Sequence, residues 1–114
     1  MSTSEIEIAD RYRELTMKWA ALRDDPKKAN RIFKSHHAYY KLIRELPEGQ
    51  SALRSLLTAP EAPVRLLAAT HSLRFAPSEA ERVLTELESA GDVYALDAKY
   101  TLMSFRKGRL DLDW

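Results

Sequence analysis

The segment VRLLAATHSL at residues 64–73 returns as VYALDAKYTL at residues 93–102, a period of 29 residues. Identical residues fill four aligned positions: Val64 with Val93, Leu67 with Leu96, Ala69 with Ala98, and Leu73 with Leu102. A self-match with a period of roughly 20 to 50 residues is typical of stacked helical repeats, whose units cover each other's apolar faces. The segment therefore predicts two similar helices with their shared positions, including Val93 and Leu96, in the core.

Apolar residues at spacings of three and four predict amphipathic helices along most of the remaining chain. We expect the first helix to be capped by Ser4, and the second to follow Asp25 as its N-cap with Pro26 as its first residue. The second helix is predicted to end at the segment PEG at residues 47–49, with Leu46 closing its apolar stripe. A short turn between two long amphipathic helices favours antiparallel packing as a hairpin.

Prolines and glycines divide the rest of the chain into shorter helices, the last of them expected to be capped by Asp92. The pattern predicts an all-α fold of about six helices in three successive pairs, with almost no strand. We expect one domain, residues 1–114, made of an N-terminal hairpin (1–47), a first repeat (50–76), a second repeat (77–107) and a tail (108–114).

The composition excludes several classes of function. The chain has no cysteine, which excludes disulfides, thiol catalysis and cysteine-ligated zinc. No apolar run approaches the roughly 20 residues needed to span a bilayer, and the acidic N-terminus is unlike a signal peptide. We therefore expect a cytoplasmic protein that does not act in a membrane.

The histidines His36, His37 and His71 are the remaining candidates for a metal or catalytic site. Adjacent histidines on a helix point about 100° apart, so His36 and His37 cannot both bind one ion without further ligands. With only three glycines, no phosphate-binding loop or nucleophile elbow can be argued. We predict no catalytic residues, no metal and no cofactor, with His36 in the core and His37 exposed.

A basic stripe on the second helix is a stronger candidate for a functional site than the histidines. Residues 26–46 carry a net charge of +5, against −2 for residues 1–25 and −2 for residues 47–114. The candidate partner-binding residues are Lys27, Arg31, Lys34, His37, Tyr40, Lys41 and Arg44. Three interpretations stay open: a solvated face whose charges pair with Asp10 and Glu14 of the first helix, a site for an acidic protein, or a site for nucleic-acid phosphates.

The segment LRSLLTAPEAPVRLLAATHSL at residues 53–73 resembles a HEAT-type unit, through Val64-Arg65, the paired alanines Ala68 and Ala69, and Leu73. The second copy departs from the pattern, with Tyr94 in place of the arginine and Asp97 in place of the first alanine. The resemblance implies a right-handed alpha-alpha superhelix built from the hairpin and two HEAT-like helix pairs. It also implies that Arg65 bonds a carboxylate, for which Asp97 or Glu61 could serve.

Three segments resemble a small bacterial family known as domain of unknown function 2019: KANRIFKSHHAYYKLIREL (28–46), VRLLAATHSLRFAPSEAERVL (64–84) and YALDAKYTLMSFRKGRL (94–110). The resemblance implies an all-α superhelix and no established catalytic residues. Similar HEAT-like proteins serve as immunity partners of secreted bacterial toxins, an analogy of fold rather than of site. We therefore expect a non-enzymatic protein-binding module, of the type that binds and occludes a toxin, with nucleic-acid binding through the basic second helix as the alternative. The sequence does not indicate the oligomeric state.

Overall fold

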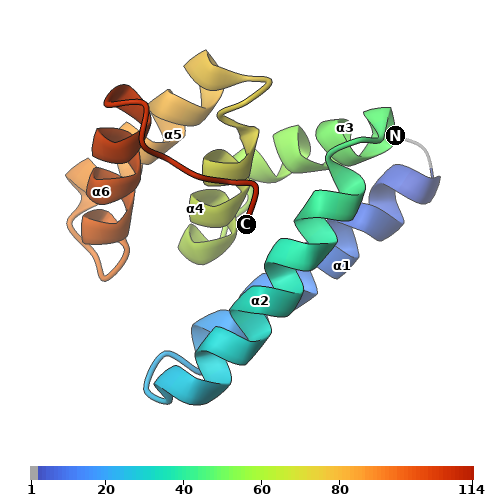
Figure 1. Ribbon diagram of the computed structural model, residues 1–114, viewed down its shortest axis with the longest axis horizontal. Helices are drawn as coiled ribbons and strands as arrows, with labels where there is room; N and C mark the ends of the chain where they lie inside the picture. The colour runs from blue at the N-terminus through green and yellow to red at the C-terminus, as the bar shows by residue number, and fades with distance from the viewer. Residues whose placement is uncertain (1–2) are drawn as a thin grey trace. The chain divides into compact units, whose positions relative to one another are not determined.

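The chain folds into six α-helices and one short 3₁₀-helix in the computed structural model, which describes residues 3–114 (Figure 1). None of these described residues belongs to a β-strand, so the predicted all-α class is confirmed. No helix among them is long and apolar enough to cross a membrane. The helices are α1 (Thr3–Ala21), α2 (Pro26–Ile43), α3 (Pro47–Ser55), η1 (Leu56–Thr58), α4 (Ala62–Ser72), α5 (Pro77–Ala90) and α6 (Ala95–Arg106).

The chain divides into two compact units, residues 1–55 and residues 56–114. The first unit contains α1, α2 and α3, and the second contains η1, α4, α5 and α6. The boundary falls inside the range 50–76 that the sequence predicts as the first repeat. The helix α3 instead belongs with the N-terminal hairpin, where it packs on α1 and contacts α2.

In the first unit, α1 and α2 form the antiparallel hairpin that the sequence predicts (Figure 1). Asp25 fixes the turn between them, because its Oδ1 accepts a hydrogen bond from the Lys28 backbone N–H at 3.2 Å and Pro26 is the first helical residue. Near this turn Trp19 faces Phe33 across the hairpin, with 5.9 Å between ring centroids. The predicted cap and turn are thus confirmed.

Two other predicted boundaries in this unit are wrong. Ser4 is not the cap of the first helix, because α1 already includes Thr3 and Ser4 lies inside it. The segment at residues 47–49 opens α3 rather than only ending α2, and Pro47 is the first residue of α3. Proline is favourable there because the first N–H groups of a helix have no partner within the helix. The turn leaves Leu46 between the two helices and 45% exposed, outside the predicted core.

Gly49, in the first turn of α3, lies against the end of α2. A β-carbon at this position would lie 2.6 Å from the carbonyl carbon of Ile43 and closer still to the carbonyl oxygen. Both atoms belong to the backbone, so a side chain fits only if α2 and α3 move apart. The close approach of the two helices therefore requires glycine at this position.

We predict that Gly49→Ala destabilises the chain by about 2–3 kcal/mol, through overpacking against the backbone of α2. Urea unfolding followed by far-ultraviolet circular dichroism measures the change. Ser51→Ala is the matched control, since Ser51 lies in the same helix and is exposed. The control should be neutral or slightly stabilising, because alanine favours helix more than serine does. Equal stability of the two variants would contradict the close approach.

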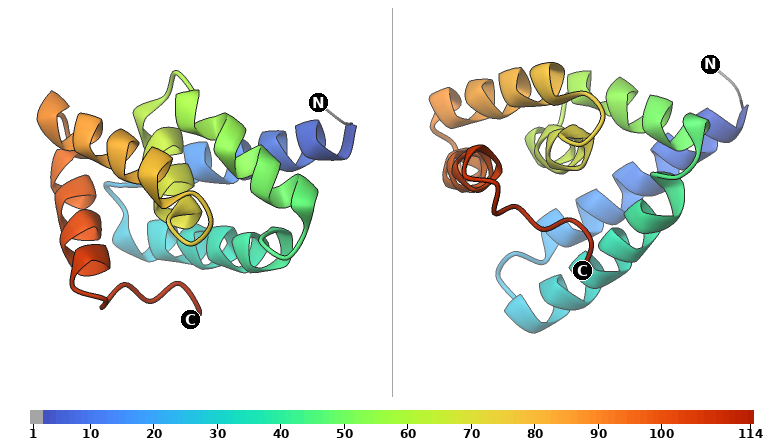
Figure 2. Two further views of the ribbon diagram at one scale, coloured as in Figure 1. Left: turned by 90° about the horizontal axis from the view of Figure 1, so that it is seen from above. Right: turned by 45° about the horizontal axis from the view of Figure 1, so that its top comes forward.

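In the second unit, α4, α5 and α6 pack in chain order, each on the next, and η1 packs on α4 and α5. The right-hand view of Figure 2 shows α4 and α6 end-on, with α5 running across them. Gly91 ends α5 with a left-handed φ of 71°, as its position predicts. The last helix starts later than predicted, at Ala95, and Asp92 accepts a hydrogen bond from the Tyr94 N–H at 2.9 Å within the preceding turn.

The two copies of the repeated segment differ in burial. Ala69 and Ala98 are both fully buried, and Leu73 and Leu102 are both in the core. By contrast, Val64 is fully buried whereas Val93 is 64% exposed, and Leu67 is 6% exposed whereas Leu96 is 56% exposed. The prediction that Val93 and Leu96 point inward is wrong. Within this unit α4 packs on both η1 and α5, whereas α6 packs mainly on α5, so one side of α6 stays uncovered.

We predict that Val64→Ala destabilises the chain by about 2 kcal/mol, through lost burial and a residual cavity. The aligned substitution Val93→Ala should stay within about 0.5 kcal/mol of the parent, as expected for an exposed site. Thermal unfolding of both variants beside the parent measures the difference. A large loss of stability in Val93→Ala would show that this side chain is covered in solution.

Candidate functional site

The outward face of α2 carries three cationic side chains. Lys27, Arg31 and Lys34 follow at spacings of four and three, so they share one side of the helix over about 10 Å of its length. All three are exposed. Within residues 3–114, none of their side chains forms an ion pair or a side-chain hydrogen bond. The structure therefore presents three positive charges directly to solvent.

The acids of the first helix do not neutralise this face, contrary to one interpretation of the sequence. Glu14 forms ion pairs with Arg11 and with Lys18, each at 3.2 Å, and both partners lie in α1 itself. Pairs at spacings of three and four within one helix are favoured because their side chains lie on the same face. The Glu14 carboxylate is thus paired within α1, and Lys27, Arg31 and Lys34 on α2 stay available.

Two of the predicted binding residues, His37 and Tyr40, are buried rather than exposed. His37 is 3% exposed and Tyr40 is fully buried, with 5.5 Å between their ring centroids. The expectation that His37 faces solvent is wrong. Residues three apart on a helix are neighbours, so His37 follows Tyr40 onto the apolar side of α2. Neither side chain belongs to an outward binding surface.

The remaining predicted residues, Lys41 and Arg44, are partly buried. The Arg44 guanidinium lies 5.2 Å from the Tyr40 ring centroid, and its Nε lies 3.5 Å from a carboxylate oxygen of Glu45. A guanidinium held over an aromatic ring and beside a carboxylate is already engaged. The cationic surface is therefore shorter than the sequence suggests and is confined to the first half of α2.

Sequence reasoning missed the second half of the outward face. Ala38 and Leu42 continue it from Lys34 in steps of four, and both are exposed. Leu42 is 70% exposed, the largest value among the exposed large apolar side chains of the described residues. Two steps of four from Lys34, by way of Ala38, lead to Leu42, so helical spacing could have identified it. We call the set Lys27, Arg31, Lys34, Ala38 and Leu42 the α2 surface.

The α2 surface combines two kinds of chemistry. Its first half can attract carboxylates or phosphates, and its second half offers a small residue followed by a bare leucine. Contacts with an apolar group on a partner would remove Leu42 from water, at a gain of roughly 25 cal/mol per Å² buried. A partner that matches both halves carries acidic side chains next to an apolar one.

His36 holds α2 to α1 beneath this surface. It lies in the core, as predicted, and is fully buried, with its Nε2 2.7 Å from the Thr16 hydroxyl oxygen. The same hydroxyl lies 2.9 Å from the Tyr12 carbonyl oxygen, so it donates to the carbonyl and accepts from the imidazole. The Tyr12 ring packs on His36 with 4.3 Å between centroids. Burial, with a smaller contribution from His37, lowers the pKa of His36 to about 4, so the ring is neutral at pH 7.

This burial predicts that stability falls with acid. The pKa of His36 is about 4 in the folded chain, against 6.5 for an unperturbed histidine. At pH values between these two, the unfolded chain binds the proton more readily than the folded chain does. The contribution of neutral His36 to the free energy of unfolding is therefore fully present above the pKa of the unfolded chain. It is lost as the pH falls toward the pKa of the folded chain. Between about pH 7.5 and about pH 5 the loss should be about 2 kcal/mol.

Urea unfolding at several pH values measures this loss. His36→Gln keeps a hydrogen-bonding group but cannot titrate, so its stability should change less over the same range. A parent stability that is flat from about pH 7.5 to about pH 5 would contradict a buried neutral His36.

The structure also places the histidines and Arg65, which the sequence singled out. Among the described residues, no group of three or more histidine and acidic side chains could hold a metal ion. Arg65 does not bond a carboxylate as predicted. Its Nη1 donates to the carbonyl oxygens of Ala59 and Pro60 at 2.8 and 2.9 Å, so it ties α4 to the loop before it.

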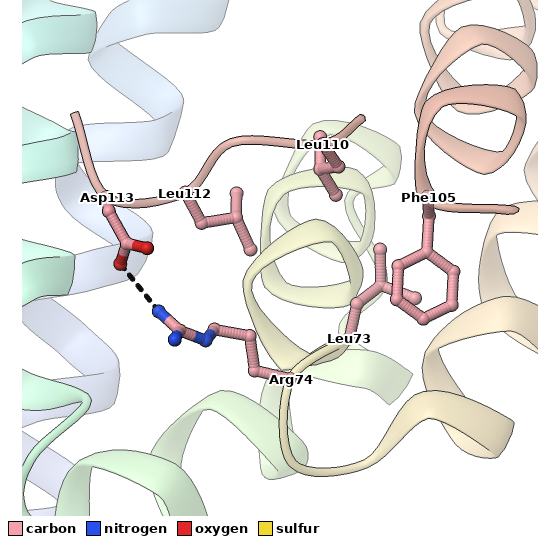
Figure 3. Close-up of a pocket in the computed structure, with 6 residues that line it drawn as sticks. All are labelled: Leu73, Arg74, Phe105, Leu110, Leu112 and Asp113. Carbon is pink, nitrogen blue, oxygen red and sulfur yellow. Dashed lines mark hydrogen bonds and ion pairs between the residues drawn. The ribbon is translucent and has the colours of Figure 1, made fainter. Parts of the chain in front are cut away.

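The tail at residues 109–114 forms one wall of a pocket in the second unit (Figure 3). The pocket holds about 170 Å³ and is lined by Leu73, Arg74, Phe105, Leu110, Leu112 and Asp113. Arg74 donates to an Asp113 carboxylate oxygen at 2.6 Å, and Leu112 is buried. The tail thus lies against α4 and α6, close to the predicted place. The ion pair in this lining is exposed on both sides, with side-chain exposures of 52% for Arg74 and 59% for Asp113.

Comparison with known proteins adds the fold alone. The structure is similar to the crystal structure of the protein RPA1889 from Rhodopseudomonas palustris, with a TM-score of 0.82 and 24% identity. The similarity covers 96% of this chain and 94% of that one. No family model and no curated protein matches the chain. An arrangement of six helices is therefore shared between two distant sequences.

Proposed function

We propose that this chain is a non-enzymatic protein-binding module that uses the α2 surface to bind an acidic partner protein. The observation that carries the proposal is a row of three cations that form no ion pair with any residue the structure describes. The row ends at Leu42, which is 70% exposed on the same side of the helix. The cations would speed association and select the partner, and Leu42 would supply a buried anchor.

An immunity-type inhibitor of a bacterial toxin is the form of this function that we favour. The resemblance to HEAT-like proteins of the domain of unknown function 2019 family supports it, as does a surface without a reactive group beside it. The three cations of the α2 surface would fit an acidic region of such a target. Inhibition would then follow from covering the target's surface in the cytoplasm, with no chemical step.

Nucleic-acid binding through the same face is the second candidate. Lys27, Arg31 and Lys34 could each neutralise a phosphate, and the absence of carboxylate partners for them in the described chain favours it. A bare leucine argues the other way, because a phosphate backbone offers no apolar group to cover it. The overall charge of only +1 is also low for a dedicated nucleic-acid binder.

The test combines two α2 variants with one matched control. Partners are captured from a host lysate, identified by mass spectrometry and then titrated individually with each variant. Arg31→Glu/Lys34→Glu reverses two cations of the α2 surface, and Leu42→Ser removes its apolar end. Arg82→Glu/Arg109→Glu makes the same change of charge at exposed positions of the second unit. We expect each α2 variant to bind about tenfold or more weakly and the control to bind like the parent.

Two results would each decide the matter differently. Equal affinity of the parent and both α2 variants for every captured protein would refute the proposed function. Binding of single-stranded or duplex probes that Arg31→Glu/Lys34→Glu abolishes and Leu42→Ser leaves intact would establish the nucleic-acid alternative. That binding should weaken with salt, with a log–log slope of about −0.7 to −0.9 per phosphate neutralised.

A further inference from the structure

The outer face of α6 is an apolar stripe that the second unit does not cover. Val93, in the turn before the helix, is 64% exposed, Leu96 and Tyr100 are each 56% exposed, and Met103 is 38% exposed. Leu96, Tyr100 and Met103 follow at spacings of four and three, which places them on one side of the helix over about 10 Å, and Val93 precedes Leu96 by three residues. Contiguous exposed apolar residues at helical spacing indicate an interaction surface.

The opposite side of the same helix faces the core. Ala98 and Leu102 are buried there, where α6 packs on α5. In the right-hand view of Figure 2, α5 and α4 lie to one side of α6. We call Val93, Leu96, Tyr100 and Met103 the α6 stripe. Its first three residues lie in the second copy of the repeat, and the counterparts of Val93 and Leu96 in the first copy, Val64 and Leu67, are buried.

Opposite charges mark the two ends of the α6 stripe. Asp92 directly precedes Val93, and Lys107 follows Met103 by four residues, so it continues the same side of the helix. Both are exposed, and among the described residues neither forms an ion pair. The Asp92 carboxylate accepts only the N–H of its own turn. One end of the stripe is therefore negative, and the other is positive.

We propose that the α6 stripe binds a second copy of this chain in an antiparallel, two-fold symmetric arrangement. Val93 and Lys107 lie equally far from Tyr100, seven residues before and after it. When two stripes lie antiparallel about Tyr100, Leu96 of one copy meets Met103 of the other, and the two Tyr100 rings meet near the axis. Each contact then occurs twice, as a two-fold interface requires.

Charge selects this orientation over the parallel one. In the antiparallel pair, Asp92 at one end of each stripe lies near Lys107 at the opposite end of the other. In a parallel pair, aspartate would face aspartate and lysine would face lysine, which is unfavourable. The helix dipoles also oppose each other favourably when the helices are antiparallel. The stripe is thus complementary to itself in one orientation only.

The dimer should be weak and reversible. Four apolar residues from each copy cover less than the roughly 1,200 Å² at which stable protein–protein interfaces begin. We expect a dissociation constant in the micromolar range or above. A weak dimer would double the number of α2 surfaces on one assembly without any change to them.

Sedimentation velocity from about 10 μM to about 1 mM tests the proposal on the full chain. The parent should shift from monomer to dimer across this range. Leu96→Glu, or Tyr100→Glu as a second variant, should raise the dimer dissociation constant by about tenfold or more, since two glutamates would meet within one interface. Leu42→Glu is the matched control, because Leu42 is at least as exposed but lies on α2, and it should dimerise like the parent.

A charge exchange tests the orientation. Asp92→Lys or Lys107→Asp alone should weaken the dimer by about three- to tenfold, and the double variant Asp92→Lys/Lys107→Asp should restore it. Circular dichroism melts show that each variant is folded. A parent that stays monomeric up to about 1 mM, a dimer insensitive to both stripe variants, or a double variant no better than the singles would overturn the proposal. Because Leu42→Glu affects only the α2 surface, failure here is distinguishable from failure of the proposed function.

Discussion

The packing of α2 against α1 is the constraint on which the candidate site depends. Burying Ala29, His36, Tyr40 and Ile43 fixes the rotation of α2 about its own axis. Side chains on a helix turn by about 100° per residue, so fixing one side determines the other. Lys27, Arg31, Lys34, Ala38 and Leu42 are exposed as a direct consequence. The hydrophobic effect in the hairpin, and not any contact between the cations, creates the α2 surface.

A polar contact inside that apolar interface fixes the register of α1 against α2. The Thr16–His36 hydrogen bond joins α1 to α2 at one position, and the Tyr12 ring covers the imidazole. Burial also raises the pKa of Tyr12, with a smaller contribution from Tyr40. The Tyr12 hydroxyl and the His36 imidazole are therefore both uncharged near neutral pH. A buried polar pair that is satisfied in only one register disfavours sliding of one helix along the other. The register matters because it determines where along α2 the cations and Leu42 lie relative to the hairpin turn.

The two units expose different kinds of surface. The first presents a cationic row with one apolar end, which suits a partner of opposite charge. The second presents an apolar stripe with one charge of each sign, which suits a copy of itself. Both rest on an amphipathic helix packed on one side only. The pocket beside the tail, by contrast, is lined by residues of its own unit, among them Leu112 and the Arg74–Asp113 pair.

The sequence by itself determined the helices and some of their ends. Spacings of three and four specify amphipathic helices, and Asp25, Pro26 and Gly91 act through the local backbone, so neighbouring residues suffice to predict them. The α2 surface was found only in part. Lys27, Arg31 and Lys34 follow from charge and spacing, whereas Leu42 carries no charge and only its helical spacing from Lys34 marks it.

Only the tertiary structure decided which apolar positions are covered. Val64 and Val93 are equivalent in the sequence, yet one is buried and the other exposed, because burial depends on which helices pack on both sides. His37 and Tyr40 were predicted as binding residues but are buried for the same reason. The spacing of apolar residues predicts that a helix has an apolar side. The helices packed around it determine how many residues of that side are buried.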